Sequence, residues 1–307
     1  MTTYLARRVV QALIVIWGVS VIVFALVRLA PSDPVTLMLS ETATPQQIAE
    51  ARHQLGFDQP IFVQYGVFVQ RALRGDLGQS IYFKEPALGV VMQALPKTLL
   101  LGAVAFALSL AVAVPIGVLS ALRRDTLWDY LGVGVALVGQ ATPPYWLGIV
   151  LILIFSVNLH VLPTSGSFGP QYIILPAVTL AAVLMPIVTR LVRSGMLDVL
   201  HEDYLRTARA KGLPERSVIL GHALRSMLIP LVTVLGLQLS ALLGGAVVIE
   251  QVFGWPGVGQ IAVNAISSRD YPIVQATVLV VSTAFVFVNL AVDALYAWLD
   301  PRIRVNA

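Results

Sequence analysis

The chain has 307 residues, of which 57% are hydrophobic and only 12% are charged. A soluble domain is typically about 45–50% apolar and about 25% charged, so the composition argues against a water-soluble protein and predicts a membrane protein. The formal charge of +4 is small, and the chain contains no cysteine, which excludes disulfides and cysteine-ligated metals. The four histidines are scattered without the spacing of a metal motif, so we expect no metal site.

Runs without Asp, Glu, Lys or Arg mark the membrane-spanning helices, because a helix needs roughly 20 apolar residues to cross the hydrocarbon. These runs are Val9–Val27, Thr98–Leu122, Tyr130–Thr189, Ser226–Ile249 and Tyr271–Val292. The third run is too long for one helix and turns polar at Asn158–Gly169, so it is interpreted as two spans. The sequence thus predicts an all-α membrane protein, a single domain over 1–307 with spans at about 9–29, 98–122, 130–157, 172–193, 227–250 and 272–297.

The first run begins after Arg7 and Arg8, as a signal peptide would. Its apolar stretch is longer than the usual 7–15 residues of a signal peptide, and no small-residue cleavage site follows it. An uncleaved first helix is therefore favoured.

The positions of Lys and Arg predict the orientation of the spans. The N-terminus, the turn at Arg123–Asp129, the stretch Arg190–Arg225 and the C-terminal tail with Arg302 and Arg304 together hold 13 of the 20 basic residues. These segments are therefore predicted to be cytoplasmic, with both termini inside.

The first long loop, 30–97, is predicted to be extracytoplasmic. It opens with a turn signal at Pro31–Pro34 and then predicts two helices. The first has Thr44 as N-cap, Pro45 at its first position and a stop at Gly56; the second follows Pro60 over Ile61–Leu73 with an apolar stripe. The loop is a cover over the outer ends of the spans, a docking surface for an extracytoplasmic partner, or both.

The second long loop, 194–226, is predicted to be cytoplasmic. An amphipathic helix is predicted within Leu197–Leu213, ended by Lys211–Gly212 and Pro214, and Glu215–Arg225 then leads into the next span. Three interpretations compete: a basic loop touching anionic lipid head groups, a helix lying in the membrane interface, or an insertion into a groove on a cytoplasmic partner.

The residues of this loop carry a family resemblance. Asp203–Leu213, continuing to Ala223–Pro230, resembles the EAA loop of ABC-importer permease subunits, and looks most like the first permease of the peptide/nickel branch. Five further motifs agree in order along the chain: Gly75–Ser80, Ala141–Gly148, Leu162–Gly166, Glu250–Gly259 and Leu299–Arg304. The resemblance covers essentially the whole sequence. Arg206 replaces the leading Glu of the general motif, as is usual in the peptide branch, so no Glu-specific contact is assigned there.

The resemblance implies the type I permease fold of ABC importers and a multi-pass location in the cytoplasmic (inner) membrane of a prokaryote. The implied partners are a second permease, two ATP-binding subunits, an extracytoplasmic peptide-binding protein and membrane lipid, with no nucleic acid. The loop would be a coupling helix that binds a cleft of the ATPase. The residues implied in coupling are Tyr204, Leu205, Arg206, Thr207, Ala208, Arg209, Lys211 and Gly212.

Small Ala208 and Gly212 would let the ATPase approach closely, while Tyr204 and Leu205 would supply apolar contacts and the basic residues would pair with acidic rims. No GxxxxGK[ST] phosphate loop occurs in the chain, so we expect a non-catalytic subunit without a bound cofactor. ATP and Mg would belong to the partner ATPases.

Two further groups of residues are weaker candidates. Glu250, Phe253, Pro256 and Gly257, in the loop at 251–271 and at the end of the preceding span, form an outer gate, a reentrant turn or a plain loop. The spans contain little fixed charge, so small polar groups are candidates for the substrate pathway: Gln140, Thr142, Asn158 and Gln238. Asp293 either reaches the membrane surface, pairs structurally or serves the pathway. The internal Pro and Gly residues are either packing features or hinges.

Peptide uptake, of dipeptides or oligopeptides, is the leading function, and nickel, glutathione and other small solutes remain open within the branch. A secondary transporter is a different class, in which we would expect internal repeats or mid-membrane acidic residues, and the sequence has neither in a convincing form.

Overall fold

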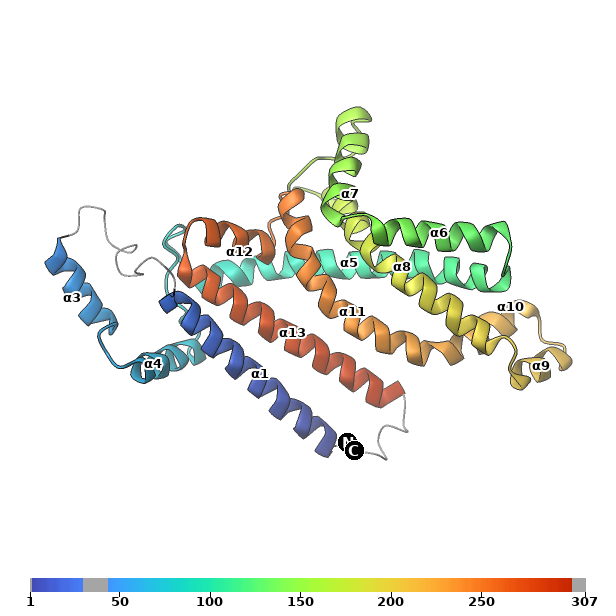
Figure 1. Cartoon of the computed structure of the whole chain (residues 1–307), viewed down its shortest axis with the longest axis horizontal. Coiled ribbons are helices and arrows are strands. Elements are labelled where there is room, and N and C mark those ends of the chain that lie inside the picture. The colour runs from blue at the N-terminus through green and yellow to red at the C-terminus, as the bar shows by residue number, and fades with distance from the viewer. Residues whose placement is uncertain (1, 30–43, 300–307) are drawn as a thin grey trace. The chain divides into compact units, whose positions relative to one another are not determined.

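The computed structural model describes residues 2–29 and 44–299. The predicted turn at Pro31–Pro34 and the basic tail lie outside the described residues, as does the side chain of Asp293. Within the described ranges the chain is helical apart from turns and a single bridge between Gln79 and Pro86 (Figure 1). The predicted all-α class is therefore confirmed.

Fifteen helical segments follow one another in the described part of the chain. They are α1 (Thr2–Leu29), α3 (Pro45–Leu55), α4 (Ile61–Leu73), α5 (Ala87–Leu122), α6 (Leu127–Ala141), α7 (Pro144–Leu151), the π-helix η1 (Ile152–Asn158), the 3-10 helix η2 (Pro170–Ile173), α8 (Ile174–Val199), α9 (Asp203–Ala210), α10 (Glu215–Ser217), the π-helix η3 (Val218–Ala223), α11 (Leu224–Val252), α12 (Val258–Ser267) and α13 (Tyr271–Leu299).

Four helices in the described part of the chain are long and apolar enough to cross a membrane: Arg7–Leu29, Ala87–Leu122, Pro170–Val199 and Tyr271–Val292. A fifth span results if the bent pair Leu127–Ala141 and Pro144–Asn158 is counted as one. The predicted span at 227–250 lies within α11, which is not among these candidates. The count of six spans therefore stays a prediction.

Two helix boundaries differ from the sequence expectation. Helix α5 begins at Ala87, well before the predicted 98, because Lys97 interrupts an uncharged run without interrupting a helix. The predicted span at 130–157 is bent by 103° between α6 and α7. Thr142 has an extended backbone there, as expected of a residue before proline, and Pro143 has no N–H to continue the ladder.

The two helices predicted in the first loop are confirmed at their ends. Thr44 accepts a hydrogen bond from the backbone of Gln47, the Gln47 side chain returns one to Thr44, and Pro45 starts α3. The helix ends at Gly56 in the left-handed conformation, with φ of 72°. Helix α4 covers the predicted Ile61–Leu73.

The chain divides into two units, which are described separately. The first comprises Thr98–Trp255 and, within the described residues, 288–299. It has two apolar cores: one joins α5, α8 and the end of α11 around Leu101, Leu180 and Phe253, and the other joins α8, α9 and the start of α11 around Met196 and Met227.

The second unit comprises Thr2–Lys97 and Pro256–Phe287. Its core joins the start of α5 to α12 and α13 through Val91, Val258 and Ile273. The Gly75–Ser80 motif belongs here, because Ser80 donates a 2.5 Å hydrogen bond to the buried Asp270 carboxylate at the start of α13. The motif therefore fastens the end of the loop to a spanning helix.

Candidate functional site

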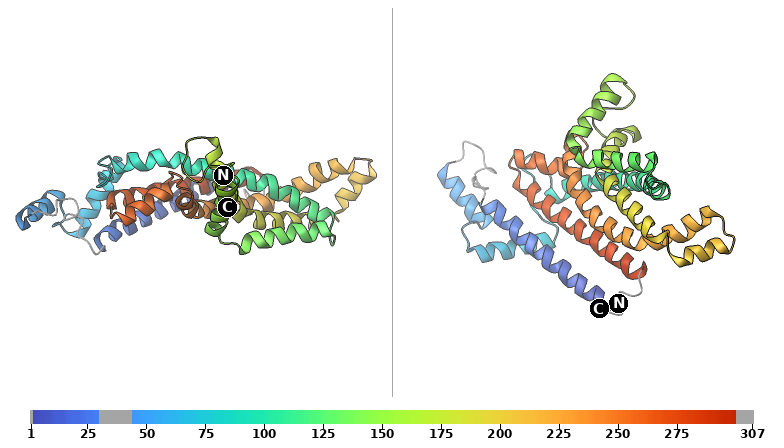
Figure 2. Two further views of the ribbon diagram at one scale, coloured as in Figure 1. Left: turned by 90° about the horizontal axis from the view of Figure 1, so that it is seen from above. Right: turned by 45° about the vertical axis from the view of Figure 1, so that its right-hand side comes forward.

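The candidate coupling helix α9 forms an excursion beyond the end of α8, and α10 and η3 return the chain to α11 (Figure 1). Figure 2 shows the same excursion, in yellow and gold, from two further sides. Asp203 lies in the first turn of α9 and Arg209 in the last, so both charges complement the helix dipole. The helix is thus short, locally stabilised and carried by two longer helices.

The amphipathic helix is shorter than the expected Leu197–Leu213. Helix α8 continues to Val199, the chain turns at Leu200–Glu202, and only then does α9 begin. Leu197 and Leu200 showed helical spacing because they lie on the last turn of α8 and its cap. The spacing was genuine, but it ran across two consecutive helices.

One face of α9 packs on the chain's own core. Leu205 is completely buried and Ala208 is nearly so, within the cluster that contains Met196, Val218 and Met227. The expectation that Leu205 and Ala208 contact an ATPase therefore needs correction: their side chains are buried within this chain. Their apolar character is instead explained by attachment of α9 to α8, η3 and α11.

The opposite face of α9 is exposed and carries both charged and polar side chains. The predicted coupling residues that are exposed on this face, or directly after it, are Tyr204, Arg206, Thr207, Arg209, Lys211 and Gly212. Arg206 makes a long contact of 3.4 Å with Asp203, and Arg209 donates two hydrogen bonds, of 3.1 and 2.9 Å, to Glu215. The hydrogen bonds from Arg209 lower the pKa of the Glu215 carboxyl below its ordinary value. Arg209 is thus paired across the turn that follows α9.

That turn depends on Gly212, whose φ is +80°. A Cβ at this position would meet no atom within 4 Å, so space is not the constraint. The left-handed backbone itself favours glycine and allows the chain to reverse toward α10. Gly212 thus has a role in the turn, and because the residue is exposed, its predicted role in close approach to a partner stays a prediction.

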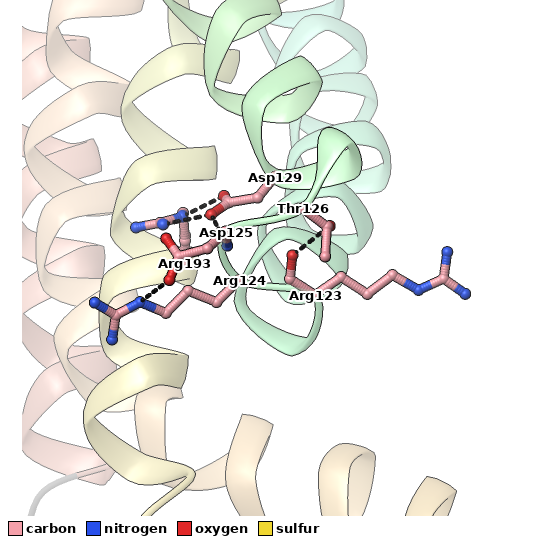
Figure 3. Close-up of polar contacts among 6 residues, drawn as sticks. All are labelled: Arg123, Arg124, Asp125, Thr126, Asp129 and Arg193. Atoms are coloured by element: carbon pink, nitrogen blue, oxygen red, sulfur yellow. Dashed lines mark hydrogen bonds and ion pairs between the residues drawn. The ribbon is translucent and has the colours of Figure 1, made fainter.

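Arg193 on α8 and Asp129 at the start of α6 form an ion pair that the sequence reasoning missed. The guanidinium donates from Nε to Oδ1 at 2.6 Å and from Nη2 to Oδ2 at 2.7 Å (Figure 3). Asp129 is buried, and its Oδ2 also accepts the backbone N–H of Asp125. The lone acidic residue in an otherwise apolar first turn of α6 was the signal available in the sequence.

Two glycines allow close packing among α5, α6 and α8. A Cβ at Gly117 on α5 would lie 2.7 Å from the Cβ of Val192 on α8. A Cβ at Gly132 on α6 would collide with the hydroxyl of Ser120 on α5. Helices α5, α6 and α8 are therefore joined pairwise, close to the end of α8 that carries α9. We call Gly117, Gly132, Asp129 and Arg193 the three-helix contact.

The candidate gate segment is a packed turn rather than a free loop. Glu250 is completely buried and accepts a 2.6 Å hydrogen bond from the hydroxyl of Thr98. Phe253 is buried, and its carbonyl accepts a 3.0 Å hydrogen bond from the N–H of Gly166, so two motifs of the sequence meet here. Pro256 is partly buried, and the buried Gly257 is the N-cap of α12.

The four candidate pathway residues do not form one cluster. Gln140 and Thr142 are adjacent at the bend between α6 and α7, where Thr142 donates its hydroxyl hydrogen to the Val138 carbonyl. Asn158 ends η1, at the far end of a helical stretch of 15 residues, and so lies roughly 20 Å from the bend. Gln238 is partly buried in the middle of α11.

The described residues contain no group of three or more His, Asp or Glu side chains able to hold a metal ion. Helix α9 itself presents charged and polar side chains on one face and is attached through Leu205 and Ala208 to α8, η3 and α11 on the other.

Two family models together match almost the whole chain. The model for the binding-protein-dependent transport system inner membrane component matches residues 113–305, and the model for the N-terminal part of such components matches residues 1–111. The chain also shares its fold with the methionine ABC transporter MetNI in an inward-facing conformation. That match has a TM-score of 0.57 at 19% identity and covers 70% of this chain and 99% of that one.

Permeases that are named for a transported substrate match over nearly the full length of this chain. The glutathione transport system permease protein GsiC of Salmonella typhimurium is 41% identical over 304 residues, covering 99% of each chain. The di/tripeptide transport system permease protein DppB of Pseudomonas aeruginosa is 40% identical, with 99% of each chain covered. The chain therefore belongs to the family of binding-protein-dependent transport system inner membrane components, as an inner-membrane permease subunit of an ABC importer in the dipeptide/glutathione branch.

Proposed function

We propose that this permease imports peptides, as one of two similar permeases that together enclose the translocation path. Two ATPase subunits in the cytoplasm would supply the energy, and an extracytoplasmic binding protein would deliver the peptide. ATP and Mg would be bound by the ATPases. The proposal includes six spans with both termini in the cytoplasm, which the distribution of Lys and Arg supports.

The observation that carries the proposal is the two-faced packing of α9. Leu205 and Ala208 attach the helix to the core of α8 and α11, while Tyr204, Arg206 and Lys211 are exposed. A helix that is firmly held on one side and exposed on the other can transmit a displacement of a bound ATPase to the spanning helices.

The three-helix contact extends this transmission. Because Asp129 and Arg193 join the start of α6 to α8, and Gly117 and Gly132 hold α5 against α8 and α6, a movement of α8 would carry α5 and α6 with it. We propose that this group moves as one body when the ATPases close, with the packed turn at Glu250–Gly257 as the candidate outer gate.

The relatives support a peptide as the substrate. One relative is named for di- and tripeptides and another for glutathione, which is itself a tripeptide derivative. The pathway candidates Gln140, Thr142, Asn158 and Gln238 are uncharged, which suits weak binding of varied peptides and leaves selectivity to the binding protein. Glutathione is the second candidate, favoured by the relatives at 41% identity.

Uptake by the complete importer in proteoliposomes tests both the ATP-driven mechanism and the substrate. We expect accumulation of a labelled dipeptide that requires ATP hydrolysis and stops with a non-hydrolysable ATP analogue. Uptake driven by an ion gradient without ATP would contradict the importer mechanism. Competition between the dipeptide and glutathione, measured with each binding protein in turn, assigns the substrate.

A further inference from the structure

Two cavities lie on either side of α4 in the second unit. The smaller, of about 190 Å³, is lined by the charged side chains of Arg28, Arg71 and Asp76 among mostly apolar residues, and we call it the polar cavity for these three groups. The larger, of about 610 Å³, has almost entirely apolar walls, including Trp17 and Met92. Phe68 and Leu77 line both cavities, so the two are neighbours.

The two cavities lie at different depths along the same spanning helices. On α1 the polar cavity is lined by Val27 and Arg28, and the apolar cavity by residues between Leu13 and Ser20. At 1.5 Å per residue, this separation is about 10–20 Å along the helix. On α13 the same order holds, with Tyr271–Gln275 at the polar cavity and Leu279–Phe287 at the apolar one. Half of a bilayer's hydrocarbon is about 15 Å thick, so this separation fits a polar cavity at the membrane surface and an apolar cavity within the hydrocarbon.

The polar cavity has an excess of positive charge. Arg28 donates from Nε to Gln64 at 2.9 Å and stacks 3.6 Å above the ring of Phe24, which holds the guanidinium at the cavity wall. Arg71 is exposed on the α4 side. The single carboxylate, that of Asp76, already accepts the backbone N–H of Gly78. Two guanidinium groups beside one carboxylate favour an anion, and guanidinium groups bind phosphate oxygens well.

Helix α4 itself has the exposure of a membrane-surface helix. It contains no buried residue, and Phe62 and Leu73 are 86% and 84% exposed. Its Tyr65 hydroxyl lies 2.8 Å from that of Ser20, and its Phe68 ring lies 5.7 Å from that of Phe24, so the helix packs directly on α1. Large exposed apolar side chains beside a spanning helix are typical of an interfacial helix.

We propose that the two cavities together bind one anionic phospholipid. The phosphate would contact Arg28 and Arg71, and an acyl chain would occupy the apolar cavity between α1, α4 and α13. A dissolved phosphate ion would use only the polar cavity, whereas a phospholipid satisfies the charge, the apolar volume and their separation in depth. The bound lipid would fasten α4, and with it the extramembrane loop, to the spanning helices.

The test uses the complete importer, purified in mild detergent and titrated with phosphatidylglycerol or phosphatidylcholine under native mass spectrometry. We expect one phosphatidylglycerol per chain to remain bound under conditions that strip phosphatidylcholine. Arg71→Gln should lower its occupancy at least fivefold, whereas Arg74→Gln, near the same helix end but lining neither cavity, should leave it unchanged. Equal losses in both variants, or equal retention of both lipids, would show annular lipid only and overturn the site.

A second pair of variants tests the apolar cavity of the proposed lipid site. Ala72→Trp fills the apolar cavity and should reduce phosphatidylglycerol occupancy, while Gln70→Trp, on α4 but outside both cavities, should not. Displacement of the lipid by millimolar inorganic phosphate would reduce the site to a simple anion site and contradict the proposal.

Because the chain contains no native cysteine, a single introduced cysteine can report whether a lipid or a protein occupies the apolar cavity. A single cysteine introduced by Ala72→Cys should react with a maleimide carried on a lipid in the assembled importer. Its cross-linking to the second permease instead would show that a protein covers the cavity, and would overturn the lipid assignment without affecting the proposed transport function.

Discussion

Helices α9 and α4 are both short and amphipathic, yet the structure uses their apolar residues in opposite ways. In α9, Leu205 and Ala208 are buried in the chain's own core, and the charged face is exposed. In α4 no residue is buried, and Phe62 and Leu73 are almost fully exposed. A similar sequence pattern thus leads to a protein core in one case and to a proposed membrane surface in the other.

This difference in burial indicates which contacts stabilise each helix. Burial of Leu205 ties α9 to the protein itself, which suits the proposed transmission of movement from an ATPase. The exposed apolar residues of α4 gain little from the protein, and in the proposed interfacial position they would gain most from surrounding lipid. Substitutions in the two helices should therefore have different consequences, and the following predictions are ordered from the largest expected effect to the smallest.

The turn after α9 should be the most sensitive position. Gly212→Val places a β-branched residue at φ +80°, which costs about 1–2 kcal/mol and displaces the segment leading to α10. We expect uptake by the reconstituted importer to fall roughly tenfold, since 1.4 kcal/mol is a factor of ten. Gly66→Val in α4 is the matched control, because Gly66 has no neighbour within 4 Å and no strained backbone. Normal uptake by Gly212→Val would contradict the role of this turn in coupling.

Truncation of the buried residue of α9 should loosen that helix selectively. Leu205→Ala removes a completely buried side chain and should cost about 2–4 kcal/mol, seen as faster hydrogen exchange across α9 and η3. Phe62→Ala in α4 should leave exchange in α4 unchanged in detergent, because Phe62 is 86% exposed. Equal effects of the two substitutions would refute the contrast between the helices.

The buried ion pair near α9 should contribute more to stability than the exposed ion pair. Asp129→Asn removes the charge of a buried carboxylate that accepts two hydrogen bonds from Arg193, and should lower stability by about 1–3 kcal/mol. Glu215→Gln breaks the exposed pair with Arg209 and should have a much smaller effect.

Thermal unfolding of the purified complex measures both changes, and peptide-stimulated ATP hydrolysis shows whether Asp129→Asn also weakens coupling. The double variant Asp129→Arg with Arg193→Asp should restore part of the stability that either single reversal loses. Absence of any such recovery would indicate that the pair contributes nothing specific.

The pH dependence of two exposed pairs should give the smallest effect. The hydrogen bond to Asp58 raises the pKa of His53, so this pair's contribution is complete below the ordinary histidine pKa of about 6.5 and is lost as pH rises through the raised value. The lowered pKa of Glu215 means that its pair with Arg209 is complete above the ordinary carboxyl range and is lost only as pH falls below it.

Between about pH 6 and pH 8, protection of the last turn of α3 from hydrogen exchange should therefore decrease slightly, while the turn after α9 stays constant. His53→Gln should abolish the change at α3. A pH-dependent change at the α9 turn over this interval would contradict the assignment of its ion pair.

The sequence by itself determined the class, the family and several helix ends. Apolar runs longer than about 20 residues admit few structures other than spanning helices. Local signals placed α3 and α4 correctly, because Thr44, Pro45 and Gly56 act on neighbouring backbone groups within one turn. The motif over Asp203–Leu213 carried the family resemblance because its residues are consecutive in the chain.

Only the tertiary structure decided which face of each helix is buried and which residues far apart in the sequence make contact. Helical spacing in α9 did not distinguish burial of Leu205 within this chain from burial against a partner, because both produce the same pattern. The pairing of Asp129 with Arg193 joins residues that are 64 positions apart, and the hydrogen bond from Thr98 to Glu250 spans 152. Such contacts follow from how helices pack, and no local propensity encodes that packing.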